Sequence, residues 1–265
     1  QRSEKAYERS LTQLRNLMVK LQTRPLTAIS EAQELVGSIV SQLLSTDEIV
    51  LQLMADAPES ENIYYHSLNV AILSMMLAKE AGFSEEEMKQ LGFAALMHDI
   101  GMLRIPTQIL RKSEALTPPE ENLLRQHTRY GFELLELTKD CPPSAKTVVL
   151  HHHERLDGSG YPDRLKGEQI DKLTQMVAMV DEYDELCHPQ DQSKAKVPHA
   201  VLSFLFKHKT KQLNKDYIGL LVKQLGIYPP GSVVQLSNGQ VGLVMSVNPK
   251  RLLFPSVLIY DPAIP

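Results

Sequence analysis

The sequence predicts a mainly α-helical protein with a small antiparallel β appendage at its C-terminus. The first observation is that apolar residues recur at helical spacing over most of the 265 residues. The second is a change of character after Pro229-Pro230-Gly231, where short valine-containing runs flank Asn238-Gly239, a strong signal for a two-residue hairpin. We therefore expect a helical connector over residues 1–60, a larger helical domain over 61–228 and the β appendage over 229–265.

Two apolar stripes predict the N-terminal helices. Their residues are Leu11, Leu14, Met18 and Leu21 in the first stripe, and Leu35, Ile39, Leu43 and Leu44 in the second. This spacing is typical of a helix that packs against a core or serves as a connector. The alternative is a signalling helix or a dimerisation seam, and on that basis we expect a homodimer.

Capping signals divide the central region into helices. A helix over 62–79 is followed by Ser84, which caps the next helix and has glutamates in its first turn, where negative charge is favourable. That second helix leads into His98-Asp99 and ends at Gly101. Thr117-Pro118-Pro119-Glu120 has the residues of a capping box and starts the helix that carries His127.

The rest of the chain continues the helical pattern before the strands begin. A helix from about residue 144 delivers the run His151-His152-His153, and the Gly- and Pro-rich residues 157–168 form a loop. The remaining elements expected are helices over 170–187 and 198–225, and strands over 233–236, 241–247 and 257–260.

Composition restricts the classes of function. A net charge of −4, from 28 basic and 32 acidic residues, gives no drive to bind DNA or RNA polymers through counterion release. Cys141 and Cys187 are too few for a disulfide-stapled secreted scaffold, so we expect free thiols and a cytoplasmic location. No apolar run approaches the roughly 20 residues that span a bilayer. The chain does not begin with Met, and we expect it to be part of a longer protein.

A series of imidazole and carboxylate side chains along the central region points to chemistry. The candidate metal ligands are His66, His98, Asp99, His127, His152, His153 and Asp181. These side-chain types can hold a pair of divalent transition metals and leave positions for water. A paired-metal site activates water against a phosphate ester. Any one of these histidines, taken alone, is more typical of a surface or core histidine.

Local context strengthens several of these candidates. Asp99 directly follows His98, so the carboxylate could bridge two metals through its two oxygens. Asp181 ends an apolar run, and burying a carboxylate without a partner is costly unless a cation lies beside it. Asp184, one turn further on, is an alternative ligand. Adjacent helical residues point about 100° apart, so only two residues of the triple-histidine run could approach one cluster, where the helix ends.

In its motifs and their order, the chain resembles the HD-GYP domain, a branch of the HD phosphohydrolase superfamily associated with hydrolysis of cyclic di-GMP. The matching segments are His66-Ser67, His98-Asp99-Ile100-Gly101, Ile105-Pro106, Ile109-Leu110, Leu116-Thr117, His127, His152-His153-Glu154, Asp157-Gly158-Ser159-Gly160-Tyr161-Pro162 and Asp181-Glu182-Tyr183-Asp184. They cover roughly residues 60–200. The resemblance implies an HD-type all-α helical bundle and the ligand set given above, with His151 outside it.

The resemblance also implies a reaction. Two divalent metals, iron or manganese by family preference and zinc or nickel by ligand type, would be bridged by Asp99, with His98 beside it. Cyclic di-GMP or a related cyclic dinucleotide would be hydrolysed to the linear dinucleotide, and further to GMP, in bacterial second-messenger signalling. Cyclases of the GGDEF type are the protein partners that the resemblance suggests, through the Tyr161-Pro162 loop.

Departures from the family pattern concern the substrate and a third metal. Met102 stands where the family usually has a lysine that contacts phosphate, and Arg104 is the nearest replacement. Asn62 stands where some members have a glutamate ligand, so we expect two metals rather than three. The stretch that is usually Arg-Pro-Tyr-Arg-like contains Gln190, and only Lys194 survives there as a cation. The substrate-binding candidates are therefore Arg104, Tyr161, Lys194 and Asp184.

Three functions are consistent with this pattern. The leading hypothesis is a metal-dependent cyclic-dinucleotide phosphodiesterase, because the ligand set is complete. The competing hypothesis is a catalytically weak or inactive metal-binding module that acts through cyclic-dinucleotide sensing or protein partners, because Met102 and Gln190 remove expected substrate contacts. A third is a metal-free helical scaffold.

Overall fold

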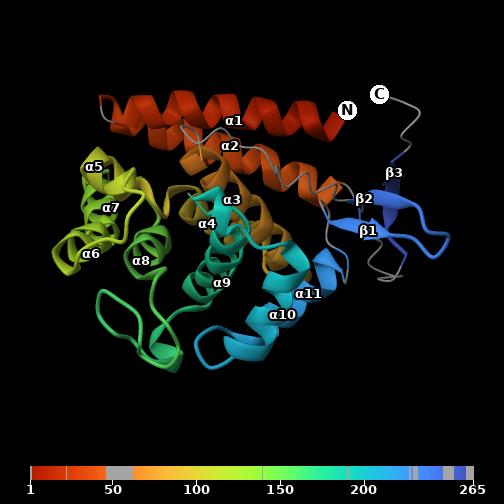
Figure 1. The fold of residues 1–265 in the computed structure, drawn as a ribbon. Helices are drawn as coiled ribbons and strands as arrows, with labels where there is room; N and C mark the ends of the chain where they lie inside the picture. The colour runs from red at the N-terminus through yellow and green to blue at the C-terminus, as the bar shows by residue number, and fades with distance from the viewer. Residues whose placement is uncertain are drawn as a thin grey trace.

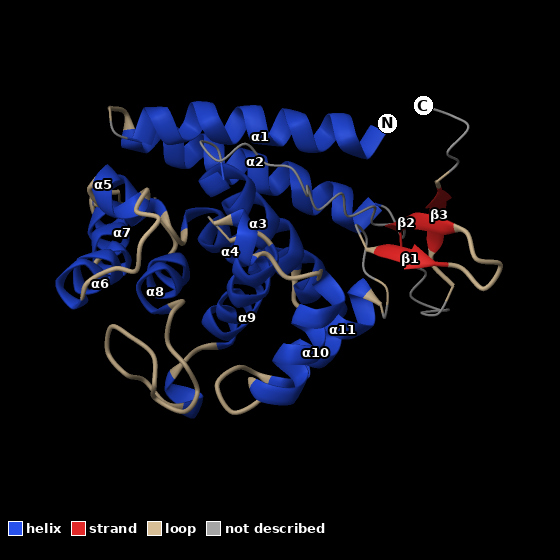
Figure 2. Ribbon diagram, in the orientation of Figure 1, coloured by secondary structure: helices blue, strands red, loops and turns tan. Residues whose placement is uncertain are grey.

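The computed structural model describes residues 2–21, 23–45, 62–138, 140–189, 191–226, 228, 232–246 and 254–260. It confirms a mainly α-helical fold with a small C-terminal antiparallel sheet (Figures 1 and 2). The helices are α1 (Arg2–Leu21), α2 (Pro25–Ser45), α3 (Asn62–Glu80), α4 (Glu85–Met97), α5 (Thr107–Leu110), α6 (Pro118–Arg125), α7 (His127–Glu136), α8 (Pro143–His151), α9 (Lys172–Cys187), α10 (Pro198–His208) and α11 (Lys215–Leu225). Short 3-10 helices are η2 (Ile100–Arg104), η3 (Gly167–Gln169) and η4 (Gln192–Lys194).

The helices α1 and α2 form an antiparallel pair that packs on α3 and α4 (Figure 1). The first predicted stripe is buried, as are Leu35, Ile39 and Leu43 of the second, whereas Leu44 is 46% exposed. These side chains belong to one hydrophobic cluster that also contains the core of α3, α4 and α9. The expected connector thus shares a core with the helical domain. Its apolar stripes are buried by helices of the same chain.

The central helices begin where the capping signals predict. The Ser84 hydroxyl accepts a hydrogen bond from the Glu87 amide at 3.2 Å, and the Glu87 carboxylate accepts one from the Ser84 amide at 2.9 Å. The Thr117 amide donates in the same way to the Glu120 carboxylate at 2.7 Å. These reciprocal contacts satisfy amides that have no partner within the helix.

Two predicted helices are divided in the structure. The helix that begins at the Thr117 cap ends at Arg125 as α6, and His127 opens the separate helix α7, because the Gln126 amide turns back to the Leu123 carbonyl. Residues 198–225 form α10 and α11 instead of a single element, because Asn214 caps α11 and accepts hydrogen bonds from the amides of Asp216 and Tyr217. Both helices pack beside α9. Cys141 and Cys187 are buried and unpaired, as expected for free thiols. Among the described residues, no helix has the length and apolarity needed to cross a membrane.

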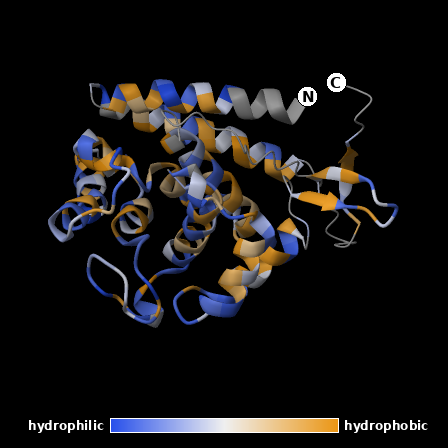
Figure 3. Cartoon of the chain, viewed as in Figure 1, coloured by the Kyte–Doolittle hydropathy of each residue, from blue (hydrophilic) through white to orange (hydrophobic). Residues whose placement is uncertain are grey.

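The appendage is an antiparallel sheet of β1 (Val233–Gln235), β2 (Val241–Ser246) and β3 (Ser256–Ile259), in the order β1-β2-β3. The predicted hairpin joins β1 to β2, with Gly239 at a φ of 85°. Its strands are hydrophobic (Figure 3), yet Val233 and Leu258 are more than 60% exposed. The division of the chain at residues 60 and 228 stays a prediction.

Candidate metal centre

The predicted ligand residues come together where helix ends meet. His98 follows the last residue of α4, Asp99 precedes η2, and His127 opens α7. His152 and His153 follow α8, while His66 and Asp181 lie within α3 and α9. All of these side chains are buried or nearly so, and His98 and His152 have no exposed surface.

Gly101 explains how Asp99 reaches His127. A Cβ atom built on Gly101 would lie 1.8 Å from the backbone oxygen of His127 and 2.6 Å from the amide nitrogen of Gly131. The backbone of η2 therefore packs directly on the first turn of α7, an approach that no residue with a side chain permits. This contact fixes Asp99 beside the start of α7.

Asp99 lies between two groups of imidazoles. Its Oδ1 is 3.3 Å from Nε2 of His127 and 3.6 Å from Nε2 of His152. Its Oδ2 is 3.6 Å from Nε2 of His98 and 4.0 Å from Nε2 of His66. Each carboxylate oxygen thus faces a different pair of ring nitrogens, which is the arrangement of a bridging ligand.

Asp181 faces the same cluster from α9. Its Oδ1 lies 3.1 Å from Nε2 of His66 and 3.4 Å from Nε2 of His98, and its Oδ2 lies 3.8 Å from Nδ1 of His153. Burial opposes the charge on Asp181, but the imidazoles of His66 and His98 beside it outweigh this effect and hold the pKa of Asp181 well below its ordinary value. For Asp99, the neighbouring histidines likewise outweigh burial and lower the pKa.

Backbone carbonyls fix which ring nitrogen faces the centre. His98 donates from Nδ1 to the Ala95 carbonyl at 2.7 Å, His127 to that of Leu124 at 2.7 Å, and His152 to that of Val149 at 3.0 Å. A carbonyl only accepts, so Nδ1 carries the proton and Nε2 of the neutral ring presents a lone pair to the cluster. Such contacts are the usual way in which a protein orients metal-binding histidines.

The donor set fits divalent cations. Nε2 of His127 and Nε2 of His152 are 3.3 Å apart, although neither has a proton to share. Among the described residues, Asp99 Oδ1 and Asp181 Oδ2 are buried without a hydrogen-bond partner. Buried polar atoms of this kind are rare unless an ion or water satisfies them. Cations next to these lone pairs would explain both the close approach of the two Nε2 atoms and the unpartnered carboxylate oxygens.

The structure groups the ligand atoms in overlapping sets, within which they lie 4.8 Å apart or less. One set is His66, His98 and Asp99, another is Asp99, His127, His152 and His153, and a third is His98, His152 and Asp181. His151 lies outside these sets, as expected, because its Nε2 pairs with Asp163 at 2.9 Å. The side chain of Asn62 lies outside the described part of the chain.

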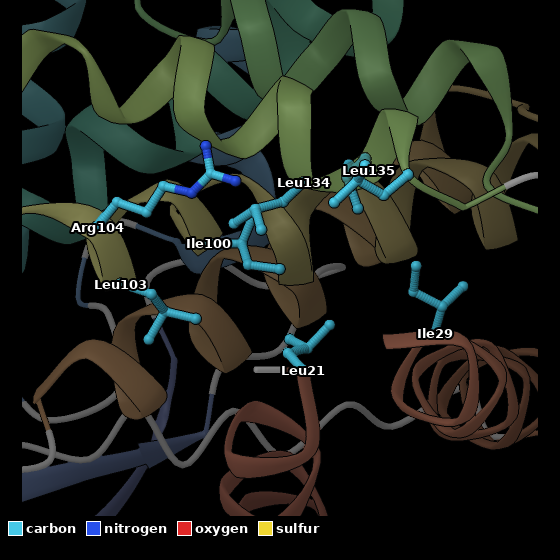
Figure 4. Close-up of a pocket in the computed structure, with 8 residues that line it drawn as sticks. Leu21, Ile29, Ile100, Leu103, Arg104, Leu134 and Leu135 are labelled. Carbon is cyan, nitrogen blue, oxygen red and sulfur yellow. The ribbon is translucent and has the colours of Figure 1, made fainter. Parts of the chain in front are cut away.

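Two substrate candidates do not reach this cluster. Arg104 donates to the Glu133 carboxylate at 2.7 Å and lines a pocket of about 320 Å³ with Leu21 and other apolar residues, between η2, α7 and the N-terminal helices (Figure 4). Lys194 is 70% exposed and pairs with Asp191 at 3.0 Å. Arg104 is close to Met102 in the sequence. In the structure its side chain nevertheless points toward Glu133 and the N-terminal helices. Gln190 lies outside the described residues.

Tyr161 lies at the rim of the cluster, on the loop after α8. Its ring stacks on His153 with 4.8 Å between centroids and 26° between planes, and the Tyr161–Pro162 peptide is cis. Burial, together with nearby Asp99 and Asp181, raises the pKa of the phenol, which stays neutral. Glu154 holds this loop by accepting hydrogen bonds from the amides of Asp163 and Leu165.

Asp184 is not placed to touch a substrate. It has no exposed surface, and its carboxylate accepts hydrogen bonds from His66 Nδ1 at 2.8 Å and from Asn69 at 3.2 Å. This corrects its assignment as a substrate-binding residue: it orients a candidate ligand. Its spacing of three residues from Asp181 placed it near the cluster, but sequence alone did not show that His66 lies opposite.

A profile of the HD domain family matches residues 38–213, which is more than half of the chain. The chain belongs to the HD domain family. The matched range starts inside α2 and ends just before α11, so it contains every candidate ligand.

The chain is similar to curated proteins that are named as phosphodiesterases. It is 32% identical over 234 residues to a cyclic di-GMP phosphodiesterase of Pseudomonas aeruginosa, covering 87% of this chain and 56% of the relative. It is 33% identical over 152 residues to a 3'3'-cGAMP-specific phosphodiesterase of Vibrio cholerae, covering 56% of this chain and 29% of the relative. These relatives agree with the HD-GYP type that the motifs indicate.

A solved structure shares the fold. An HDG"Y"P protein from Bdellovibrio bacteriovorus superposes with a TM-score of 0.66 at 18% identity, over 79% of this chain and 68% of that chain. The chain spans about half the length of the relative from Pseudomonas aeruginosa.

Proposed function

We propose that this HD domain is a metal-dependent phosphodiesterase that hydrolyses cyclic di-GMP or a related cyclic dinucleotide to the linear dinucleotide, and further to GMP. The observation that carries the proposal is the position of Asp99, whose two oxygens each face a separate pair of histidine nitrogens. Similarity to phosphodiesterases of cyclic di-GMP and 3'3'-cGAMP supports the substrate class.

The ligand roles follow from the contacts. Asp99 would be shared by two divalent cations, with His66, His98 and Asp181 on one side. His127, His152 and His153 would complete the other side. Iron or manganese is the expected pair, and the nitrogen-rich ligand set is also compatible with zinc or nickel.

The chemistry then depends on what each residue holds in place. Bound cations supply an activated water and neutralise charge that develops on a phosphate. Asp99 and Asp181 remain ionised, and the carbonyl contacts keep the Nε2 lone pairs of His98, His127 and His152 directed at the centre. Tyr161 covers His153 and restricts access of solvent from the rim.

A second candidate function is a catalytically weak metal-binding module that senses a cyclic dinucleotide or binds partners such as GGDEF-type cyclases. The favouring observation is that Arg104 and Lys194, the cations expected to replace lost substrate contacts, pair with Glu133 and Asp191. A homodimer and a cytoplasmic location stay predictions from the sequence.

Anaerobic turnover of cyclic di-GMP by protein loaded with ferrous iron or manganese separates the two functions. Products are resolved by chromatography, and metal is counted in the same sample. Linear dinucleotide or GMP should appear with about two metals per chain. Product formation and bound metal should both be lost in Asp99→Ala. Bound metal without product from cyclic di-GMP or 3'3'-cGAMP would favour the non-catalytic module, and absence of bound metal would reject both functions.

A further inference from the structure

We propose that Arg125, supported by the ring of Tyr161, forms an anion subsite at the rim of the metal centre. Its ligand would be the second phosphate of a cyclic dinucleotide, the one that is not cleaved. This inference rests on the proposed function, and it names a residue that the sequence pattern did not indicate.

The position of Arg125 follows from a chain of ring contacts. Arg125 is the last residue of α6, and its guanidinium carbon lies 5.0 Å from the ring centroid of Tyr161. The Tyr161 ring is in turn stacked on His153, which belongs to the ligand cluster. A guanidinium against an aromatic face is a favourable arrangement that still leaves its edge free to bind an anion.

The guanidinium can accept a new partner at little cost. Nη2 of Arg125 donates to the Glu121 carboxylate at 2.5 Å, one turn earlier on α6, and the two side chains are 46% and 51% exposed. Exposed pairs of this kind contribute little stability. An arginine has five N–H donors, so donors remain for a phosphate even while the Glu121 contact persists. Its planar fork matches two phosphate oxygens at once.

The local charge balance makes this cation significant. Met102 brings no charge, and Arg104 is held by Glu133 beside the α1–α2 pair. With Met102 uncharged and Arg104 paired away from the cluster, Arg125 is a cation that lies against the Tyr161 ring.

Geometry selects the second phosphate. The phosphate to be cleaved must lie beside Asp99, whereas Arg125 contacts the ring of Tyr161, which in turn stacks on the candidate ligand His153. A cyclic dinucleotide carries its two phosphates on opposite sides of a macrocycle. When one phosphate is held at the cluster, the other is displaced toward the rim, where a guanidinium can meet it.

The test compares Arg125→Gln with Arg104→Gln, a matched control. Arg104 also donates to an exposed glutamate, at 2.7 Å, and its guanidinium carbon lies 5.8 Å from the Tyr130 centroid. Each manganese-loaded protein is assayed with cyclic di-GMP and with bis(p-nitrophenyl) phosphate, which has only one phosphate. Metal content is measured in every sample.

Arg125→Gln should raise KM for cyclic di-GMP about tenfold to a hundredfold, as expected for loss of one charge-assisted contact. It should leave kcat, metal content and hydrolysis of the single-phosphate ester close to wild type, and Arg104→Gln should change none of these. An unchanged KM overturns the subsite. An equal loss on both esters, or loss of metal, shows instead that Arg125 supports the ligand cluster.

Failure of the proposed function is recognised separately. If the wild-type protein hydrolyses neither cyclic di-GMP nor 3'3'-cGAMP, binding of cyclic di-GMP to metal-loaded protein is measured by calorimetry. Weaker binding by Arg125→Gln alone, by the same factor, supports the subsite in a sensing module. Equal binding by both variants, or no binding by wild type, overturns it.

Discussion

Asp184 and His66 form a hydrogen bond of 2.8 Å between α9 and α3, with the carboxylate accepting from Nδ1 of the ring. Nε2 of the same ring faces Asp181 and His98 at the cluster. The carboxylate therefore fixes both the tautomer and the direction of a candidate ligand. It is itself held by Asn69 and by His188 at 3.0 Å, so it has little freedom to move.

Asp184→Asn should weaken metal binding about tenfold to a hundredfold, because a neutral amide supports the ring less strongly than a carboxylate does. The affinity can be measured by titrating manganese into metal-free protein. Asp191→Asn is the control, since Asp191 is an exposed aspartate whose partners are Ser193 and Lys194. Equal affinities for wild type and Asp184→Asn would show that the contact is not needed to orient His66.

Metal removal should lower the melting temperature. Asp99 Oδ1 and Asp181 Oδ2 are buried without hydrogen-bond partners among the described residues. Bound cations would satisfy them, and would do so only in the folded chain. A ligand present at a hundred times its Kd stabilises the folded state by about 2.7 kcal/mol. Excess EDTA should reduce Tm and added manganese should restore it. Asp181→Ala should show a much smaller response, and an equal response would place the stabilising metal elsewhere.

The sequence predicted the helical fold and the cluster because both depend on short-range signals. Capping boxes at Ser84 and Thr117 set the helix starts, and candidate ligands such as His98 and His152 lie at helix ends, where side chains converge. Arg104 was predicted to replace a substrate contact near Met102. The sequence does not show that the 3-10 helix η2 directs this side chain toward Glu133 and the α1–α2 pair.

Long-range packing explains the other differences. The role of Asp184 depends on α3 lying against α9, and the stacking of Tyr161 on His153 depends on how the loop after α8 returns. Arg125 precedes His127 by two residues, but its approach to Tyr161 joins positions far apart in the chain. No local pattern encodes these contacts.

Glu185 should make the metal-free protein less stable as pH rises. Loss of hydration, followed by repulsion from Asp181, raises the pKa of Glu185 from 4.5 to about 8. The unfolded chain therefore releases this proton at a lower pH than the folded chain, and stability falls between these two values and then levels off. The residue as a whole has exposed surface although its carboxylate loses hydration, so solvent screening reduces the effect, and only its direction is predicted.

The measurement for Glu185 is the urea midpoint of wild type and Glu185→Gln in EDTA at several pH values. The glutamine variant should gain on wild type as pH rises from about 4.5 to about 8. Bound metals should reduce this difference, since nearby cations favour the carboxylate. A difference that does not vary with pH would mean that Glu185 titrates normally and lies farther from Asp181.

Gly101→Ala should disrupt both folding and metal binding. The new Cβ would meet the His127 carbonyl oxygen at 1.8 Å, so η2 must move away from α7 and carry Asp99 away from His127. Overpacking of this kind typically costs about 1–3 kcal/mol, and the rigid backbone contact here favours the upper part of that range.

Gly219→Ala is the control, because that glycine lies inside α11 with nothing within 4 Å of its Cβ position. It should stabilise the protein by about 0.5–1 kcal/mol through helix propensity. Urea unfolding and metal content of the two variants check the pair, and a Gly101→Ala protein that keeps wild-type stability and metal would show that η2 does not set the position of Asp99.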